Sequence, residues 1–533
     1  MIKFSKIFKY ALVLAVSLVL VFLISTTQRK LNETINKHDL FYTGQINNAP
    51  PMVAFTTMAL GSFRGLVADL LWLRAASLQE DKNYFEMVQL ASWITKLQPR
   101  FAGATAYLAW NMAYNISVTC SLWQDRWYWV WEGIKLIRDE ALLYNPDAPR
   151  LYWELAVIFQ QKMGNVLDNA SYYYKARLAT EMEAIITLDP KWEQWSTMPC
   201  DAAGFMKMYP ENDPMWDAAR RAGLPGFAAL NEEFRSQSLL PEKFVDALNN
   251  EAQARNIDAA LRTIWLYDKY RLRADYIHKL NQEYGSLDWR LAEAQALYWA
   301  SEGIRVTGHD MQCSRIIATC LQEMMRAGRI LWTHQDGYRY LIIAPNLDIV
   351  MSAIRTYDWA YDKANNLESF RTGKINFMKN AAVFLFYFGR LQETREVYKI
   401  LQKDDHTVKY PPFETFLARE LKEIVATATF KQITDIINAF MQNALNAAVN
   451  DDEEKVAMYE LMAKKVYADY QKGIRSDKER GRRGLAPYNE IRNQVVKDYL
   501  ANANPKAAAI IRAKLKSQQI LRDAEAAEKE QKK

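Results

Sequence analysis

Three similar phrases recur at nearly regular intervals in the N-terminal part of the chain, and this repetition is the feature that most restricts the fold. The phrases are LQPRFAGATAYLAW around Pro99, YNPDAPRLYWELA around Pro146 and LDPKWEQW around Pro190, so the prolines are 47 and 44 residues apart. Self-similarity at a fixed period of roughly 20 to 50 residues is typical of stacked helical hairpins. Because each hairpin buries its apolar face against its neighbours, the repetition predicts a continuous helical array.

The second phrase matches the tetratricopeptide pattern of an aromatic residue, a leucine, a small residue and a second aromatic residue. Tyr152, Leu155, Ala156 and Phe159 have this spacing. The first phrase keeps the aromatic spacing but carries Asn111 where a small residue is expected. A third match lies in NAAVFLFYFGRLQETREVYKIL, where small residues allow two helices to approach and a glycine ends the first helix: Ala382, Gly389, Thr394 and Tyr398.

The composition also favours helices. Gly (19) and Pro (16) are scarce for 533 residues, whereas Trp (16) and Tyr (29) are abundant. Sheet proteins need many turn residues, while long helices pack well through aromatic side chains. We therefore predict an all-α fold, a tetratricopeptide-like superhelix of helical hairpins (an α-solenoid), with more than about 60% helix, no strand alternation and essentially no sheet.

The N-terminus has the pattern of an export signal. Lys3, Lys6 and Lys9 precede the apolar run from Ala11 to Ile24, and no cleavage motif follows it. With the four preceding residues the run approaches the roughly 17 residues of a tilted membrane span. This pattern predicts a single-pass transmembrane anchor in an inner membrane, with the N-terminus in the cytoplasm and the body on the periplasmic side. The alternative is a cleaved signal and secretion to the periplasm.

Breaker clusters and changes in composition divide the chain into six segments. We predict a cytoplasmic stub and signal-anchor helix (1–30), a linker (31–51), N-terminal helical repeats (52–198), an irregular insertion or hinge (199–260), C-terminal helical repeats (261–470) and a basic, partly disordered helical tail (471–533). From Tyr470 onward the chain has sixteen Lys or Arg and eight Asp or Glu, so this tail has a net charge of +8 and the rest of the chain −2. The whole chain's net charge of +6 therefore arises in the tail. A body near neutrality argues against nucleic-acid binding.

The sequence contains none of the common catalytic or cofactor motifs. It has no HExxH, GxSxG, Walker-type, GxGxxG or EF-hand pattern. Its five histidines and four cysteines show no metal-ligand spacing, and the cysteines are too scattered for a disulfide framework. We therefore predict no catalytic residues, no metal site and no cofactor, and a protein that is not an enzyme.

Five segments together form a distinctive sequence: FRGLVADLLWLRAASLQE (63–80), QLASWITKLQPRF (89–101), YLAWNMAYNISV (107–118), RDEALLYNPDAPRLYWELAVIFQQKMG (138–164) and LDWRLAEAQALYWASEG (287–303). In these segments the chain resembles a family of uncharacterised, membrane-anchored bacterial proteins with tetratricopeptide-like repeats. The resemblance implies an α-superhelix outside the inner membrane that scaffolds other envelope proteins, and it implies no activity. Family members tend to carry His where this chain has Gln295, which argues against a catalytic base there.

A helix rich in tryptophan holds the candidate binding residues. Trp123, Trp127 and Trp131 form a ridge at helical spacing, which could be a platform for a glycan or peptide, although we favour packing between hairpins. Two asparagines one turn apart fit a groove that holds a peptide backbone, and fit interior hydrogen bonding equally well. We predict that a partner protein binds the concave side of the N-terminal repeats through Asn111, Asn115, Arg126 and Trp127.

Two functions of different class follow from these observations. The first is a membrane-anchored interaction scaffold of the bacterial cell envelope, which binds a partner protein of unknown identity through a concave helical-repeat surface. The alternative is an envelope glycan-binding protein or glycan-active enzyme on an α-superhelical frame, which the abundant tryptophans and many unassigned carboxylates support. Two carboxylates about 5 to 9.5 Å apart in an aromatic cleft would favour the alternative. The sequence predicts no oligomeric state.

Overall fold

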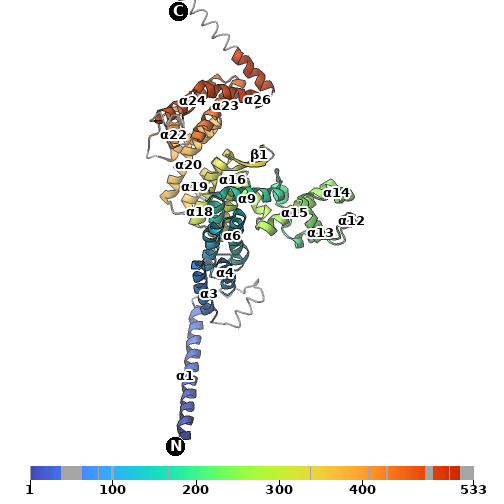
Figure 1. Ribbon diagram of the computed structural model, residues 1–533, viewed down its shortest axis with the longest axis vertical. Coiled ribbons are helices and arrows are strands. Elements are labelled where there is room, and N and C mark those ends of the chain that lie inside the picture. Colours follow the sequence, from blue (N-terminus) through green and yellow to red (C-terminus); the bar gives the residue numbers. More distant parts are fainter. Residues whose placement is uncertain are drawn as a thin grey trace, which may run out of the picture. The chain divides into compact units, whose positions relative to one another are not determined.

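The structure, a computed structural model, is almost entirely helical (Figure 1). It describes residues 2–37, 63–81, 83–97, 101–165, 168–335, 338–405, 408–427, 430–474, 484–502 and 505–516. The chain divides into two compact units, Met1–Phe101 with Leu143–Asn145, and Ala102–Leu142 with Pro146–Lys533. The short helix α7 (Leu142–Tyr144) lies at their boundary. The all-α class predicted from the sequence is confirmed.

The first unit contains a long N-terminal helix and a helical hairpin. Their bounds are α1 (Ile2–Lys37), α3 (Phe63–Glu80) and α4 (Tyr84–Leu97). Helices α3 and α4 pack against each other, with Leu78 on one and Ala91 on the other fully buried. Arg74 bridges to Glu86 across the hairpin at 3.1 Å, so this charge within an apolar segment has a partner on the neighbouring helix.

The predicted membrane anchor is wrong. In the part of the chain that the structure describes, no helix combines the length and the apolar character that a membrane span requires. The unbroken apolar run Ala11–Ile24 has 14 residues, fewer than the roughly 20 that cross the hydrocarbon core as a helix. Helix α1 then continues through charged and polar residues to Lys37. The predicted inner-membrane localisation with a periplasmic body is therefore not supported. Of the predicted linker, residues 38–51 lie outside the described residues.

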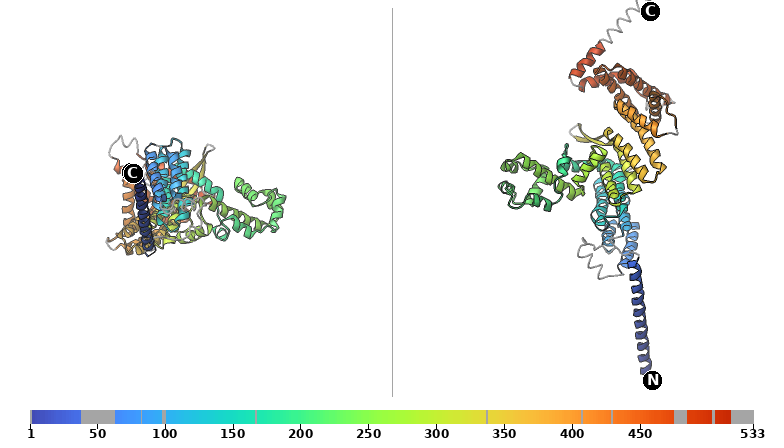
Figure 2. Two further views of the ribbon diagram at one scale, coloured as in Figure 1. Left: turned by 90° about the horizontal axis from the view of Figure 1, so that it is seen from below. Right: turned by 180° about the vertical axis from the view of Figure 1, so that it is seen from behind.

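The second unit begins with three helices that each continue into a wider π-helical segment. Their ribbons have the cyan to teal colours of residues 102–164 in Figure 2. They are α5 (Ala102–Trp110) with η1 (Asn111–Ile116), α6 (Trp123–Lys135) with η3 (Leu136–Ala141), and α8 (Pro149–Val157) with η4 (Ile158–Gly164). The short η2 (Ser117–Thr119) precedes α6. Pro149 stands in the first turn of α8, where its missing N–H is not needed. The tetratricopeptide-like residues Tyr152, Leu155 and Phe159 are buried.

Short helices follow and form a core of their own. Their bounds are α9 (Ser171–Ile186), α10 (Trp192–Trp195), α11 (Ala202–Met208), α12 (Met215–Arg221), α13 (Phe227–Gln237), α14 (Glu242–Leu248), α15 (Glu251–Tyr270) and α16 (Ala274–Tyr284). Large apolar side chains of α11 to α15, among them Phe205, Trp216, Phe234 and Phe244, pack together. These helices occupy most of the segment 199–260 that the sequence analysis set apart.

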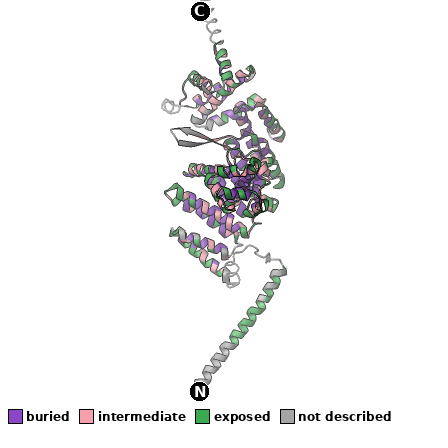
Figure 3. Cartoon of the chain, turned by 90° about the vertical axis from the view of Figure 1, so that its right-hand side faces the viewer, coloured by how far each residue is buried: buried purple, intermediate pink, exposed green. Residues whose placement is uncertain are grey.

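Helix α17 (Ala292–Thr307) lies at the centre of the second unit's packing. All its residues from Ala292 to Gly303 are buried. Buried residues, purple in Figure 3, recur along the packed helices, whereas the helix next to the N-terminus is exposed where it is described. It packs against α18 (Met311–Ala327), and also against α8 and η4 from much earlier in the chain. A side chain at Gly164 would meet the Glu293 carboxyl, and one at Gly303 would meet Tyr152, so α8 and α17 run in opposite directions.

A β-hairpin departs from the expected absence of strands. Strands β1 (Arg329–Gln335) and β2 (Tyr338–Ala344) pair antiparallel, with Arg329 opposite Ala344. The Ile330 N–H donates to Asp288 Oδ2 at 2.8 Å and the Leu341 N–H to the Tyr172 hydroxyl at 3.2 Å. Residues distant in sequence thus hold the hairpin. The expectation that no segment would form strands is wrong for these fourteen residues.

Several of the remaining helices pack against their neighbour in the chain, and others pack against a helix further along. Their bounds are α19 (Val350–Lys363, preceded by η5, Leu347–Ile349), α20 (Glu368–Tyr387), α21 (Leu391–Asp404), α22 (Phe413–Thr427), α23 (Phe430–Val449), α24 (Glu453–Gly473) and α26 (Tyr488–Asn502). Gly389 has φ +78°, a conformation that favours glycine, and it follows the end of α20. Ala382 and Thr394 are fully buried between α20 and α21, so the predicted hairpin is confirmed. A further helix covers residues 505–516.

Candidate functional site

Asn111 and Asn115 lie in the π-helical segment η1 and bond to each other. Asn111 is fully buried; its amide nitrogen donates to the Tyr107 carbonyl oxygen at 3.0 Å. Its side-chain oxygen accepts a hydrogen bond from the Asn115 amide at 2.6 Å. Asn115 itself is half-buried. The polar atoms of Asn111 are therefore used inside its own helix, the second of the two arrangements that the sequence left open.

Arg126, near the start of α6, joins three parts of the chain. Its Nε donates to the Cys120 carbonyl oxygen at 2.8 Å, and its Nη1 donates to Asn169 Oδ1 at 2.6 Å. The same nitrogen lies 3.4 Å from Asp168 Oδ1, and 13% of the side chain is exposed. Because Cys120 precedes α6 and residues 168–169 precede α9, Arg126 fixes the backbone at the beginning of both helices.

The ridge of tryptophans divides into a packed part and an exposed part. Trp127 is buried and stacks on Trp131, with ring centroids 5.5 Å apart and planes at 8°. Trp131 in turn meets Tyr270 of α15 edge-on at 5.4 Å, and the Arg177 guanidinium lies 5.2 Å from the Trp127 ring. These two tryptophans pack between helices, whereas 48% of Trp123 is exposed.

Trp123 belongs to a group of large exposed apolar side chains at the beginnings of α6 and α9. We call this group the α6–α9 patch, defined by Val118 (50% exposed), Leu122 (61%), Trp123 (48%) and Tyr172 (52%). The Trp123 ring lies 6.2 Å from that of Tyr173, so the two helix starts are adjacent, whereas the hydroxyl of the neighbouring Tyr172 accepts a hydrogen bond from Leu341 of β2. Trp123, Tyr172 and the neighbouring arginine are of the residue types enriched in protein–protein binding hot spots, while Leu122 and Val118 add exposed apolar area.

Three of the four patch residues were not expected from the sequence, although one signal was present. Leu122 occupies the N-cap position of α6 and makes no side-chain cap bond. Ser, Thr, Asp or Asn is favoured at an N-cap, where replacement by an apolar residue costs about 0.5 to 2 kcal/mol. An exposed leucine at this position therefore lowers stability without contributing to the core. Among the predicted residues, Arg126 lies beside the patch, Trp127 is one turn along α6, and Asn111 and Asn115 are on the preceding helix.

Asp168 holds the loop before α9 in place. Its carboxylate is 6% exposed, accepts a hydrogen bond from the Ala170 N–H at 2.8 Å and pairs with the buried Lys162 ammonium of η4. Burial by itself raises the pKa of Asp168, but hydrogen bonds from Lys162 and the Ala170 amide outweigh it and hold the pKa below its usual value. The charged form is thus favoured, and the backbone under the patch is anchored by ionic contacts.

Two carboxyl groups lie inside the packing of α17, α18 and η4. Burial raises the pKa of Glu293 to about 7, Lys175 lowers it in part, and Glu323 adds to the rise. Burial also raises the pKa of Glu323, which accepts a hydrogen bond from the Gln160 amide at 3.3 Å. Among the described residues, Glu293 Oε2 and both polar side-chain atoms of Gln295 have no hydrogen-bond partner. Glu293 is thus an acid that can keep its proton near neutral pH.

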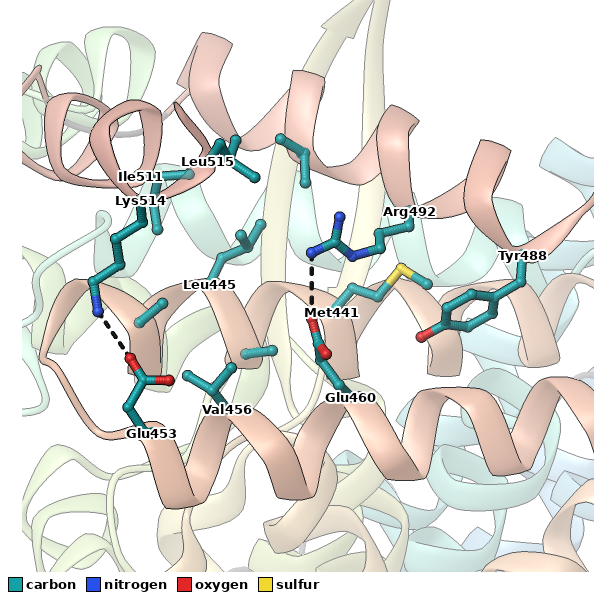
Figure 4. Close-up of a pocket in the computed structure, with 13 residues that line it drawn as sticks. Met441, Leu445, Glu453, Val456, Glu460, Tyr488, Arg492, Ile511, Lys514 and Leu515 are labelled. Atoms are coloured by element: carbon teal, nitrogen blue, oxygen red, sulfur yellow. Dashed lines mark hydrogen bonds and ion pairs between the residues drawn. The ribbon is translucent and has the colours of Figure 1, made fainter. Parts of the chain in front are cut away.

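A small cavity separates the C-terminal helices. It has a volume of about 60 Å³ and lies between α23, α24, α26 and the helix at residues 505–516. Figure 4 shows the apolar side chains of Leu445 and Val456 between two ion pairs, Glu460 to Arg492 at 3.3 Å and Glu453 to Lys514 at 3.1 Å. A volume of this size holds a few water molecules and no larger ligand. The cavity therefore marks the seam along which the C-terminal helices pack.

No metal centre emerges from the geometry. In the ranges that the structure describes, no three His, Cys, Asp or Glu side chains are grouped so that they could hold a metal ion. Cys120, Cys200, Cys313 and Cys320 are free thiols, and the last two are buried. His38 and His406 lie outside the described residues.

Comparisons with known proteins add little to this description. No protein-family model matches the chain, and no curated protein matches it. One solved structure, described as "Structure of Naa15/Naa10 bound to HypK-THB", contains a chain that is 14% identical to this one; the alignment covers 83% of this chain and 68% of that chain, with a TM-score of 0.13. Because this TM-score is too low to indicate a shared fold, the fold rests on the helices and contacts described above.

Proposed function

We propose that this chain is a helical-repeat protein that binds a partner protein, and that the α6–α9 patch is the binding surface. The observation that carries the proposal is the exposure of Leu122 and Trp123 to solvent, at 61% and 48%, immediately beside the half-buried Arg126. Tryptophan, tyrosine and arginine dominate the energetics of protein interfaces because large rigid side chains bury much area at little entropic cost.

The backbone under the patch supports this role because it is already fixed. Arg126 bonds to Cys120 and Asn169, and Asp168 bonds to Lys162 and to the Ala170 amide. A surface that is ordered before binding loses less conformational entropy when the partner docks. Ionic contacts of this kind preorganise the two helix starts, so most of the interaction energy is available for affinity.

The arrangement of the helices is the second support. Consecutive hairpins such as α17–α18 and α20–α21 pack against their neighbours, as in an α-solenoid of tetratricopeptide-like repeats. Solenoids of this type present extended surfaces to partner proteins. Within the proposal, Asn111, Asn115 and Trp127 act by holding the helices that carry the patch, and no catalytic step, metal or cofactor is required.

Site-specific photocrosslinking tests the proposal. A photoreactive phenylalanine analogue replaces Trp123 in the full-length chain, and a second variant carries it at Leu461, which is 62% exposed on α24. Irradiation in the native cells should give a defined protein adduct at position 123 and not at position 461. The adduct's protein is then purified, and its affinity for the chain should fall about ten-fold or more when Trp123 is changed to Ala. Equal adducts at both positions, or an unchanged affinity, would refute the assignment.

A further inference from the structure

A large open cleft lies between α10, α15 and α16, and none of the residues that line it belongs to the α6–α9 patch. Its volume is about 870 Å³. Small-molecule sites have volumes of roughly 300 to 1,000 Å³, so this cleft has the size of a ligand site. Its walls combine one aromatic ring with planar polar groups: Trp192, Gln194, Arg255, His278, Asn281 and Gln282.

Trp192 gives the cleft a rigid aromatic wall. Its ring meets Trp195 edge-on at 5.1 Å and 75°, and meets Trp289 edge-on at 6.4 Å and 68°. Two such contacts fix the orientation of the indole while the residue stays half-buried. Within the described chain, the Trp192 indole N–H donates no hydrogen bond. Because the residue is half-buried, this N–H is available to a ligand.

The polar groups of the cleft are held in place and keep unused hydrogen-bonding atoms. Asn281 Oδ1 accepts hydrogen bonds from the Leu287 N–H at 3.2 Å and from the Trp289 indole N–H at 3.0 Å. Its amide is thereby oriented, and its nitrogen is left to donate to a ligand. Likewise the Gln282 amide nitrogen lies 2.9 Å from His278 Nε2, which leaves the Gln282 oxygen as an acceptor.

The charges of the cleft compensate one another. Lys191 pairs with Asp189, and Arg255 pairs with Glu251 at 3.3 Å. Glu193 adds a further carboxylate to the lining. A phosphate group or a nucleic acid would require an excess of positive charge, which these pairs remove. The charge balance therefore favours a neutral, hydroxyl-rich ligand.

From this geometry we infer that the cleft binds a neutral saccharide, with one sugar ring stacked on Trp192 and its hydroxyls bonded to Asn281, Gln282 and Arg255. A sugar ring has an apolar C–H face and an edge of hydroxyls that donate and accept. The C–H face suits the negative face of an indole, and the hydroxyls suit fixed amide and guanidinium groups. A peptide would instead need apolar pockets for alternate side chains, and the cleft offers a single aromatic wall.

A glycan array probed with the full-length protein tests the inference, followed by titration of the bound neutral oligosaccharide. Trp192→Ala should weaken binding by about ten-fold or more, the upper range for an aromatic contact, and Trp192→Phe should restore much of it. Asn281→Ala should also weaken binding. Trp93→Ala, at a 55% exposed tryptophan of α4, is the matched control and should have no effect.

Three results would overturn the inference. They are the absence of any bound neutral oligosaccharide at millimolar concentration, an affinity that Trp192→Ala leaves unchanged, and selective binding of acidic glycans or peptides that Trp192→Ala abolishes. Circular dichroism of each variant must first match the native spectrum, and Trp192→Phe keeps the test valid if Trp192→Ala unfolds. Trp123→Ala should leave saccharide binding intact, which separates this site from the α6–α9 patch.

Discussion

Replacing Glu293 by Gln should make the stability of the protein less dependent on pH. Glu293 is 6% exposed in the middle of α17, and burial raises its pKa from 4.5 to about 7. A group whose pKa is higher in the folded state binds more protons when folded, so stability falls as pH rises between the two values. Below about pH 4.5 both states are protonated and there is no penalty; above about pH 7 the penalty is complete.

The magnitude follows from the same pKa shift. A rise from 4.5 to about 7 corresponds to about 3 kcal/mol of folding free energy. The neutral amide of Glu293→Gln avoids this penalty at every pH. The hydrogen bonds of the Gln amide differ from those of a protonated carboxyl. That difference is the same at every pH, so it shifts the free energy of unfolding by a constant amount. The informative quantity is therefore the pH dependence of the difference between the two proteins.

Urea unfolding followed by tryptophan fluorescence measures this quantity. The free energy of unfolding of Glu293→Gln relative to the native protein should increase by about 3 kcal/mol between roughly pH 4 and pH 8.5. Glu232→Gln, at an exposed position of α13, is the control and should give a difference that does not change with pH. A Glu293→Gln difference that is equally flat would show that Glu293 ionises as in water and that the packing around it is open.

Three further changes test the packing. Gly133→Ala should destabilise the protein by about 1 to 3 kcal/mol, because the added Cβ would lie 2.7 Å from the Ala109 carbonyl oxygen. Gly226→Ala is the control, because no atom lies within 4 Å of its added Cβ. Equal melting temperatures of the two variants would contradict the close approach of α5 and α6. Arg126→Ala should lower thermal stability by about 1 to 3 kcal/mol through its lost hydrogen bonds, whereas an unchanged melting temperature would place Arg126 on a free surface. Truncation after Tyr470 should lower the melting temperature and increase binding of a hydrophobic dye, because it uncovers apolar residues around Met441. An unaltered melting curve would show that the tail does not pack against α23 and α24.

Local patterns in the sequence were enough to predict the helices and one hairpin in detail. The spacing of Ala382, Gly389 and Thr394 predicted α20, its glycine end and α21, because each depends on neighbours within a few residues. Trp127 was predicted as a partner-binding residue, while packing between hairpins was the favoured interpretation of the tryptophan ridge; the structure places Trp127 against α9. Such features follow from helical periodicity, which is a local property of the chain.

The errors concern features that depend on length or on distant partners. The apolar run at the N-terminus resembled a span, yet no described helix meets the length and apolarity that a membrane requires. The strands β1 and β2 pair with each other, and this hairpin was missed; two groups that anchor it, on Asp288 and Tyr172, come from far away in sequence. β-propensity depends strongly on such tertiary context.

The sequence by itself thus determined that the chain is helical and that one helical pair, α20 and α21, meets at Gly389, since side-chain periodicity and turn residues act over a few positions. Only the tertiary structure decided which side chains are buried and which are exposed. Helix α17 packs on α8 although α9 to α16 intervene, and this contact buries Glu293 beside Gly164. In the same way the meeting of α6 and α9 leaves Trp123 exposed while Trp127, one turn later, is covered. A helix face becomes core or surface according to its partner, and the partner comes from distant sequence.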